Sequence, residues 1–175
     1  IMLFEDSNFL SEDSKNFIND QILTNEFPFY MNDHAVPGDN VKNMMHVVLP
    51  RIEDRDKTYR ENKFLNEFVK ILNEFCNKNK LHYNEILRIA VNLTYYNGVK
   101  DMSPTHCDHD FEHNQLLIYL NDPLDKDSCT VIINEQGSEI KIKPEKYKGV
   151  CFSRMPHYAS FPKIGERYVL VFTFR

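Results

Sequence analysis

The pattern of hydrophobic and polar residues predicts a helix-rich first half of the chain. Between residues 59 and 78, apolar residues recur every three or four positions, and lysine and glutamate occupy positions between them. This spacing places the apolar side chains on one face of a long helix, which we expect to pack against a sheet. The face consists of Phe64, Leu65, Phe68, Val69, Leu72, Phe75 and Cys76.

A shorter helix is predicted near the N-terminus, beginning at Ser11. This serine is a good capping residue, and Glu12 and Asp13 place negative charges in the first turn, where they are favourable. Apolar residues then recur at helical spacing as far as Ile22. Short apolar runs predict strands at 3–4, 27–31 and 45–49, and a Pro-Gly sequence predicts a turn at 37–40.

The second half of the chain alternates short apolar runs with turn residues. These runs predict strands at 86–96, 114–120, 130–134, 139–143, 149–152 and 168–174. Helices that precede a series of short strands predict an α+β fold. We expect residues 1–175 to form one domain, in which a double-stranded β-helix, or jelly roll, is supported by the N-terminal helices.

Composition narrows the choice of compartment and partners. A net charge of −5 argues against a nucleic-acid partner, because binding to phosphate backbones needs clustered lysine and arginine. The four cysteines form no Cys-x-x-Cys pair, which suits free thiols in a cytoplasmic protein. No apolar run has the length of a membrane span, so we expect no membrane partner.

A His-x-Asp sequence after the predicted strand 86–96 is the strongest candidate for chemistry. In an extended chain His106 and Asp108 would point to one side and Cys107 to the other. His157, just after the predicted strand 149–152, is the best candidate for a third ligand. Two histidines and one carboxylate, with open positions opposite, form the metal site of non-haem Fe(II) oxygenases. By itself, His-x-Asp is also common in polar turns.

The order of these residues resembles that in the 2-oxoglutarate- and Fe(II)-dependent dioxygenases, especially the prolyl-hydroxylase-like branch and its small phage-type members. That family places a distal histidine about fifty residues after His-x-Asp, and an arginine or lysine about ten residues later. Here His157 and Arg167 occupy those positions. Tyr119 lies in a Tyr-Leu-Asn sequence like the family's, and Tyr96 precedes His106 by ten positions, where the branch has another tyrosine.

The resemblance implies both cofactors and a reaction. It implies that His106, Asp108 and His157 hold Fe(II), which also binds the 2-oxo acid end of 2-oxoglutarate. Arg167 would then pair with the distal carboxylate of 2-oxoglutarate, and Tyr119 and Tyr96 would donate hydroxyl groups to it. With O2 as the other co-substrate, the protein would hydroxylate an unactivated C–H bond.

The prime substrate is not specified by these motifs. The prolyl-hydroxylase-like order suggests a peptidyl proline, and a small molecule is the other option. The chain also departs from the family pattern, with Ser128-Cys129-Thr130 in place of Gly-x-Thr and Val169 where some branches have serine. Two alternatives stay open: a cupin-type metalloenzyme without 2-oxoglutarate, which could use His109 as a ligand, and an inactive jelly-roll binding domain.

Four further residues have two interpretations each. His109 and His113 are spaced one helical turn apart and could form a rival metal pair, although Phe111 and the following strand favour a loop. Arg88 and Asn92 alternate along the strand before the site. They either line the pocket or face outward as polar positions, and the outward arrangement is the more common one.

Overall fold

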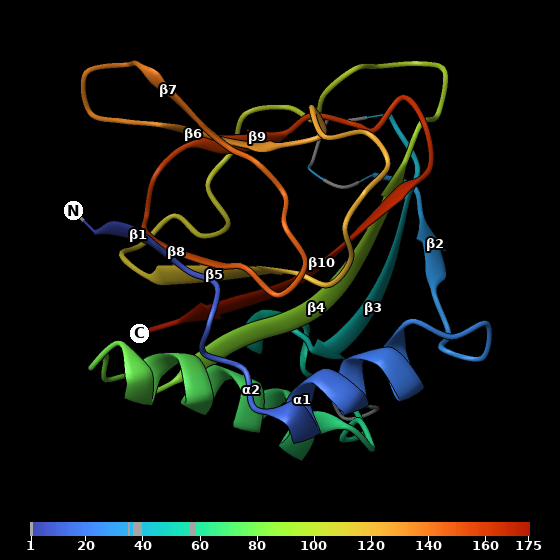
Figure 1. Ribbon diagram of the computed structural model, residues 1–175. Coiled ribbons are helices and arrows are strands. Elements are labelled where there is room, and N and C mark those ends of the chain that lie inside the picture. The colour runs from blue at the N-terminus through green and yellow to red at the C-terminus, as the bar shows by residue number, and fades with distance from the viewer. Residues whose placement is uncertain (1, 35, 37–39, 57–58) are drawn as a thin grey trace.

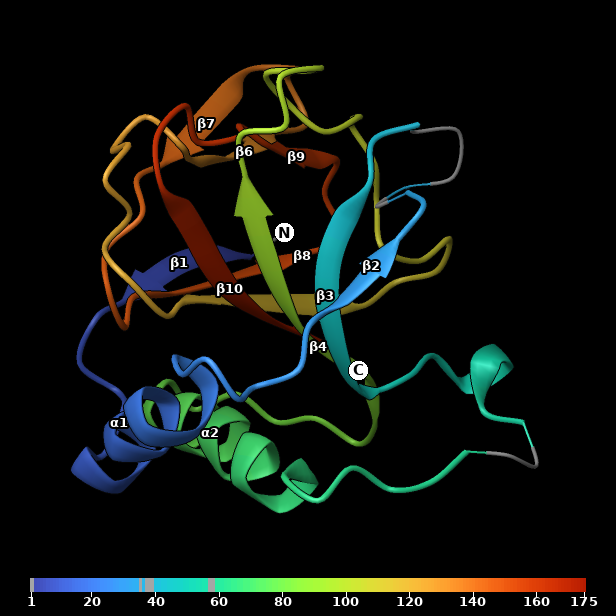
Figure 2. The ribbon, with the colours of Figure 1, turned by 90° about the vertical axis from the view of Figure 1, so that its right-hand side faces the viewer.

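Two antiparallel β-sheets face each other, and the helices cover the outer side of the larger sheet (Figures 1 and 2). The structure, a computed structural model, describes residues 2–34, 36, 40–56 and 59–175. Of the turn predicted at 37–40, residues 37–39 lie outside this set. The arrangement is a jelly roll with N-terminal supporting helices, so the predicted α+β fold is confirmed.

The larger sheet has seven strands in the order β1-β8-β5-β10-β4-β3-β2. Their bounds are Leu3–Asp6 (β1), Gly149–Ser153 (β8), Asn114–Tyr119 (β5), Glu166–Phe174 (β10), Ile86–Tyr95 (β4), Asn43–Leu49 (β3) and Tyr30–Asn32 (β2). The smaller sheet has the order β7-β6-β9, with bounds Glu139–Ile142 (β7), Thr130–Ile133 (β6) and His157–Ala159 (β9). Strands that are distant in sequence are therefore neighbours in both sheets.

The long helix α2 (Leu65–Lys78) begins six residues later than the pattern predicts. The reason is a turn at Asn62, whose side-chain oxygen accepts the N–H of Phe64 at 2.9 Å and whose carbonyl accepts the N–H of Leu65 at 3.0 Å. An asparagine that bonds its own nearby backbone competes with helical hydrogen bonding. Of the predicted apolar face, Phe68, Leu72, Phe75 and Cys76 are buried, while Phe64, Leu65 and Val69 are half-buried; Ile71, which the prediction did not include, is also buried.

The N-terminal helix α1 (Glu12–Phe17) begins at the predicted cap. Ser11 accepts the N–H of Ser14 at 3.2 Å, and the helix continues as one π-helical turn, Ile18–Ile22. The hydroxyl of Ser11 also donates to Glu74 of α2 at 2.6 Å, so the cap ties the two helices together. A single 3-10 turn, Ile52–Asp54, follows β3.

Each face of the large sheet has its own hydrophobic core. On the outer face, Phe68 and Phe75 of α2 pack with Leu170 and Phe172 of β10 and are fully buried. Burial of one such side chain contributes about 1.5–3 kcal/mol. Gly149 allows this close approach, because a Cβ atom there would lie 2.7 Å from the ring of Phe75.

The inner face of the large sheet packs against the small sheet. The core between the two sheets includes Leu117 and Phe152 from the large sheet and Ile132 from β6 of the small sheet. None of the helices in the described part of the chain has the length and apolar character needed to cross a bilayer.

Candidate functional site

A cavity opens between the two sheets, and its lining includes Arg88 and Asn92 of β4 and alternate residues of β10. The strand register places Arg88 opposite Thr173 at one end and Arg167 opposite Thr94 at the other. Of the two interpretations of Arg88 and Asn92, the structure supports the inward one, since both line the cavity. Strand alternation decides this, because the opposite face of β4 is buried against the helices.

Three predicted ligands meet at one wall of this cavity. The potential ligand atoms of His106, Asp108 and His157 all lie within 4.8 Å of one another. Asp108 Oδ2 is 3.4 Å from His157 Nε2, close to the ~3 Å expected for neighbouring ligands that are each about 2.1 Å from one ion. The backbones of the two histidines are also paired, with N–H to carbonyl distances of 3.0 and 2.9 Å.

Backbone carbonyls orient both imidazoles. His106 Nδ1 donates to the carbonyl of Pro104 at 2.9 Å, and His157 Nδ1 donates to the carbonyl of Met155 at 2.9 Å. These hydrogen bonds place the proton on Nδ1 and leave the Nε2 lone pair directed away from the backbone. Two imidazoles held through Nδ1, beside a carboxylate, are a suitable ligand set for a divalent transition metal.

The charge state of the cluster also suits a cation. Burial alone would raise the pKa of Asp108, but the hydrogen bond and charge of His157 and the charges of Arg88 and His106 hold this pKa well below its usual value. Burial, reinforced by the neighbouring His157, lowers the pKa of His106. At neutral pH the cluster therefore presents a carboxylate and a neutral imidazole, the forms that bind metal.

This ligand set predicts a metal preference. Nitrogen and carboxylate ligands follow the general affinity order of divalent ions, so Co(II) and Ni(II) should bind at least as tightly as Fe(II), and Zn(II) should compete with them. Titration calorimetry of the metal-free protein with each ion measures this order. Stronger binding of Fe(II) than of Ni(II) would contradict the mixed nitrogen and oxygen site.

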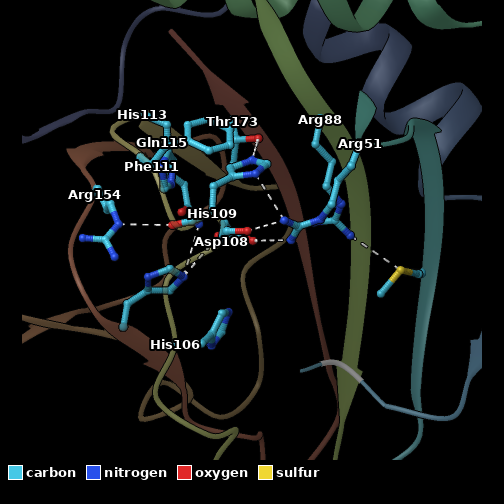
Figure 3. Close-up of polar contacts among 12 residues, drawn as sticks. Arg51, Arg88, His106, Asp108, His109, Phe111, His113, Gln115, Arg154 and Thr173 are labelled. Atoms are coloured by element: carbon cyan, nitrogen blue, oxygen red, sulfur yellow. Dashed lines mark hydrogen bonds and ion pairs between the residues drawn. The ribbon is translucent and has the colours of Figure 1, made fainter. Parts of the chain in front are cut away.

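Arg51 contacts Asp108 (Figure 3). This arginine was not identified from the sequence. One guanidinium nitrogen lies 3.5 Å from Asp108 Oδ1, while another donates to the Asp108 carbonyl and, at 3.3 Å, to His109 Nδ1. Arg51 lies more than fifty positions before its partners, in a loop after β3, and no motif marks it. Its contacts fix the orientation of the carboxylate.

The far end of the cavity holds Arg167, whose side chain is almost completely buried. Its Nη1 donates to the carbonyl of Ser128 at 3.0 Å, and its Nε has no hydrogen-bond partner among the described residues. A buried cation without a counter-ion is costly. The Ser128-Cys129-Thr130 segment, a departure from the family pattern, thus supplies an acceptor to Arg167, and the remaining donors suit a carboxylate.

The two tyrosines lie in different environments. Tyr119 is fully buried, and its hydroxyl donates to Thr130 Oγ1 at 2.8 Å, while Thr130 itself lines the cavity. Tyr96 is 50% exposed and does not line the cavity in the described part of the chain. Tyr119 therefore lies one hydrogen bond away from the cavity, and Tyr96 lies outside its wall.

Substitution of Tyr119 tests this arrangement. Tyr119→Phe should lower the free energy of unfolding by about 1 kcal/mol, the usual contribution of one buried hydrogen bond, and should weaken 2-oxoglutarate binding only modestly. Denaturant unfolding and ligand titration measure the two effects. Tyr96→Phe is the matched control, because its exposed hydroxyl should leave stability unchanged. A loss of stability in Tyr96→Phe equal to that in Tyr119→Phe would contradict this account.

The segment between Asp108 and β5 is a loop, as the sequence favoured, and not a helix. Within it, His109 and His113 are buried, with ring centroids 4.8 Å apart. His109 accepts from Arg51 and donates through Nε2 to Thr173 Oγ1 at 2.9 Å. Burial and the charge of Arg51 lower the pKa of His109 to about 4, so this ring is neutral. Because both of its nitrogens have partners, His109 is poorly placed to bind a metal.

Gln115 is a second residue that sequence reasoning missed. Its amide nitrogen donates to His157 Nε2 at 3.3 Å, and its Oε1 is buried without a partner among the described residues. The signal was present in the sequence: a polar residue two positions before Leu117, on the inward face of a strand that is otherwise apolar. An amide there can orient a metal ligand or a molecule bound beside it.

Comparison with known proteins supports the fold. No protein-family model matches the sequence, and no curated protein matches it. The structure is similar to a 2OG-Fe(II) oxygenase family oxidoreductase from Burkholderia pseudomallei, with a TM-score of 0.76 and 14% identity over 98% of this chain and 84% of that chain. The fold is therefore that of the 2-oxoglutarate- and Fe(II)-dependent oxygenases.

Two prolyl hydroxylases are also similar. One, from Trichoplax adhaerens, was solved with a peptide fragment of the hypoxia inducible factor oxygen degradation domain; its TM-score is 0.71, at 14% identity over 98% of this chain and 82% of that chain. The other is the viral collagen prolyl hydroxylase of Paramecium Bursaria Chlorella virus-1, in a 2-oxoglutarate complex. Its TM-score is 0.60, with 19% identity over 99% and 95% of the two chains.

Proposed function

We propose that residues 1–175 form a single oxygenase domain that uses Fe(II), 2-oxoglutarate and O2 to hydroxylate an unactivated C–H bond. One observation carries this proposal. A His-Asp-His cluster, whose imidazoles are held through Nδ1, and a buried, incompletely paired Arg167 line the same cavity. The His-Asp-His cluster suits a metal ion. Arg167 suits the distal carboxylate of a dicarboxylate that chelates this ion.

Each residue has a separate task in this proposal. His106, Asp108 and His157 would hold the ion and leave coordination positions open, because these three are the ligands found in the described part of the chain. Arg167 would orient 2-oxoglutarate by a two-pronged contact, with Thr130 and, behind it, Tyr119 shaping the wall beside it. We propose that Tyr96 contributes only from the rim. When bound, Fe(II) and 2-oxoglutarate supply the oxidising chemistry with O2.

The apolar walls of the cavity have a protective role. Leu117, Val169 and Val171 lie between the metal cluster and Arg167. They keep water from the space between the two charged ends, which strengthens the electrostatic contacts there. The prime substrate in this proposal is a peptide or a small molecule, and a prolyl residue is the option suggested by the similar prolyl hydroxylases.

The cupin-type alternative is less well supported, because it needs further protein ligands and both nitrogens of His109 are engaged elsewhere. An inactive binding domain would not explain why Arg167 is buried without a counter-ion.

All four cysteines are free thiols in the fold. This supports our further proposal that the protein works in a reducing, cytoplasmic compartment.

Formation of succinate from 2-oxoglutarate tests the proposed function directly. The metal-free protein, supplied with Fe(II), 2-oxoglutarate and O2, should form succinate slowly even without a prime substrate, and a metal chelator should stop the reaction. NMR measures succinate over time. If neither succinate formation nor 2-oxoglutarate binding is detected, the oxygenase proposal is wrong. Metal binding without 2-oxoglutarate binding would favour the cupin-type alternative.

A further inference from the structure

Arg88 is a cation in the cavity to which the proposed function assigns no task. It projects from β4 toward the metal cluster, on the same side as Arg51 (Figure 3). Its hydrogen-bond acceptor among the described residues is Met45 Sδ, at 3.7 Å, and it forms no ion pair with any of them. A thioether is a weak acceptor. The guanidinium of Arg88 therefore retains most of its donors for another molecule.

Arg88 and Arg167 lie at opposite ends of the paired strands β4 and β10. Arg88 pairs with Thr173 across the sheet, and Arg167 pairs with Thr94, six residues further along β4. The two arginines therefore line opposite ends of the cavity.

The metal cluster lies near the Arg88 end. Gln115, which contacts His157, is the other neighbour of Thr173 across the sheet, so Arg88, Thr173 and Gln115 form one row. From the metal, 2-oxoglutarate would extend toward Arg167 and away from this row. Arg88 consequently faces the part of the cavity that is left for the molecule to be oxidised.

The balance of charge leaves the Arg88 end of the cavity with an excess of positive charge. In the loaded site Fe(II), Arg167, Arg51 and Arg88 would carry five positive charges, against three negative charges on Asp108 and the two carboxylates of 2-oxoglutarate. Arg51 pairs with Asp108 and reaches solvent, with 29% of its side chain exposed. Arg88 is partly buried, and burial lowers its pKa, although the charges of Asp108 and Asp54 act in the other direction. A cation in this position calls for an anion from outside the chain.

We propose that Arg88 binds an anionic group of the prime substrate, so that the substrate is a molecule bearing a carboxylate or a phosphate close to the oxidised carbon. This inference rests on the proposed function. A guanidinium pairs with either group through two parallel hydrogen bonds, which would fix the substrate's orientation beside the metal. The same contact would select against uncharged analogues, because they would leave Arg88 unpaired.

Binding of small anions tests the inference. The protein is loaded with Zn(II) and saturating 2-oxoglutarate, which cannot turn over, and is titrated by calorimetry with acetate, inorganic phosphate and uncharged acetamide. Wild type should bind at least one anion and not acetamide. Arg88→Met should bind that anion at least about tenfold more weakly. Lys141→Met, which removes one exposed charge from β7, is the matched control and should bind like wild type.

Two controls separate this role from others. Affinity of Arg88→Met for Zn(II) should be unchanged or higher, since a nearby cation is removed; a clear fall would show that Arg88 serves to hold Asp108, and would overturn the inference. Acetate and phosphate distinguish the two kinds of anionic substrate. If 2-oxoglutarate itself fails to bind, the proposed function fails and the inference with it. If 2-oxoglutarate binds but Arg88→Met and wild type bind anions equally, or neither binds any, the inference alone is wrong.

Discussion

Asp108→Ala should abolish measurable Fe(II) binding and all succinate formation. The substitution removes the only carboxylate of the cluster and leaves two imidazoles beside Arg51, whose charge would then repel the ion. His106→Ala should have a similar effect, because two remaining protein ligands hold a labile divalent ion poorly. Metal titration by calorimetry and succinate detection by NMR measure the two losses.

The chain offers close controls for these variants. Asp110→Ala removes an exposed carboxylate two positions away, and His82→Ala removes an exposed imidazole far from the cluster. Both should bind metal like wild type. Circular dichroism should show that all four variants are folded. If Asp108→Ala or His106→Ala took up Fe(II) with wild-type affinity, the three residues would not form the metal site.

Arg167→Ala should weaken 2-oxoglutarate binding strongly while leaving metal affinity near normal. The distal carboxylate would lose its counter-charge inside a buried site, a change that costs about 2–5 kcal/mol. This corresponds to a loss of roughly thirtyfold to several thousandfold in affinity. Titration of the Zn(II)-loaded protein with 2-oxoglutarate measures the loss, and a parallel Zn(II) titration confirms an intact metal site.

Arg167→Lys should be intermediate, because a point charge replaces the two-pronged guanidinium. Arg154→Ala is the control: Arg154 is an exposed arginine whose Nε donates to the carbonyl of His109, and its loss should not change 2-oxoglutarate affinity. Wild-type affinity in both Arg167 variants would remove the reason for assigning a 2-oxoglutarate site to this end of the cavity.

The fold was predictable because the spacing of apolar residues along the chain indicates which side chains are buried. The short apolar runs of β5, β8 and β10 are largely buried, and the predicted stripe on α2 includes four of the five buried residues of that helix. Element ends were less predictable, since they depend on local side-chain bonds such as that of Asn62. The resemblance of the order of His106, Asp108, His157 and Arg167 to that of a known family placed these residues in one site, and all four line one cavity.

The supporting residues could not be predicted for a different reason. Arg51 acts through contacts made between segments that are distant in sequence, and its neighbours in sequence carry no signal. The inward direction of Arg88 depends on which face of β4 the helices cover. Alternation within one strand identifies two faces but does not say which of them meets the core.

The backbone pairing of His106 with His157 has a consequence for unfolding. Between these residues lie β5, β6, β7 and β8, which belong to both sheets. An ion shared by the two imidazoles would close a loop of about fifty residues, much as a disulfide does. If the ion stayed bound to the unfolded chain, it would reduce the conformational entropy of that chain. An ion bound only by the folded chain would act by mass action, adding about 2.7 kcal/mol at a concentration one hundred times its Kd. The lifetime of the folded protein in a cell would then follow the local supply of the metal.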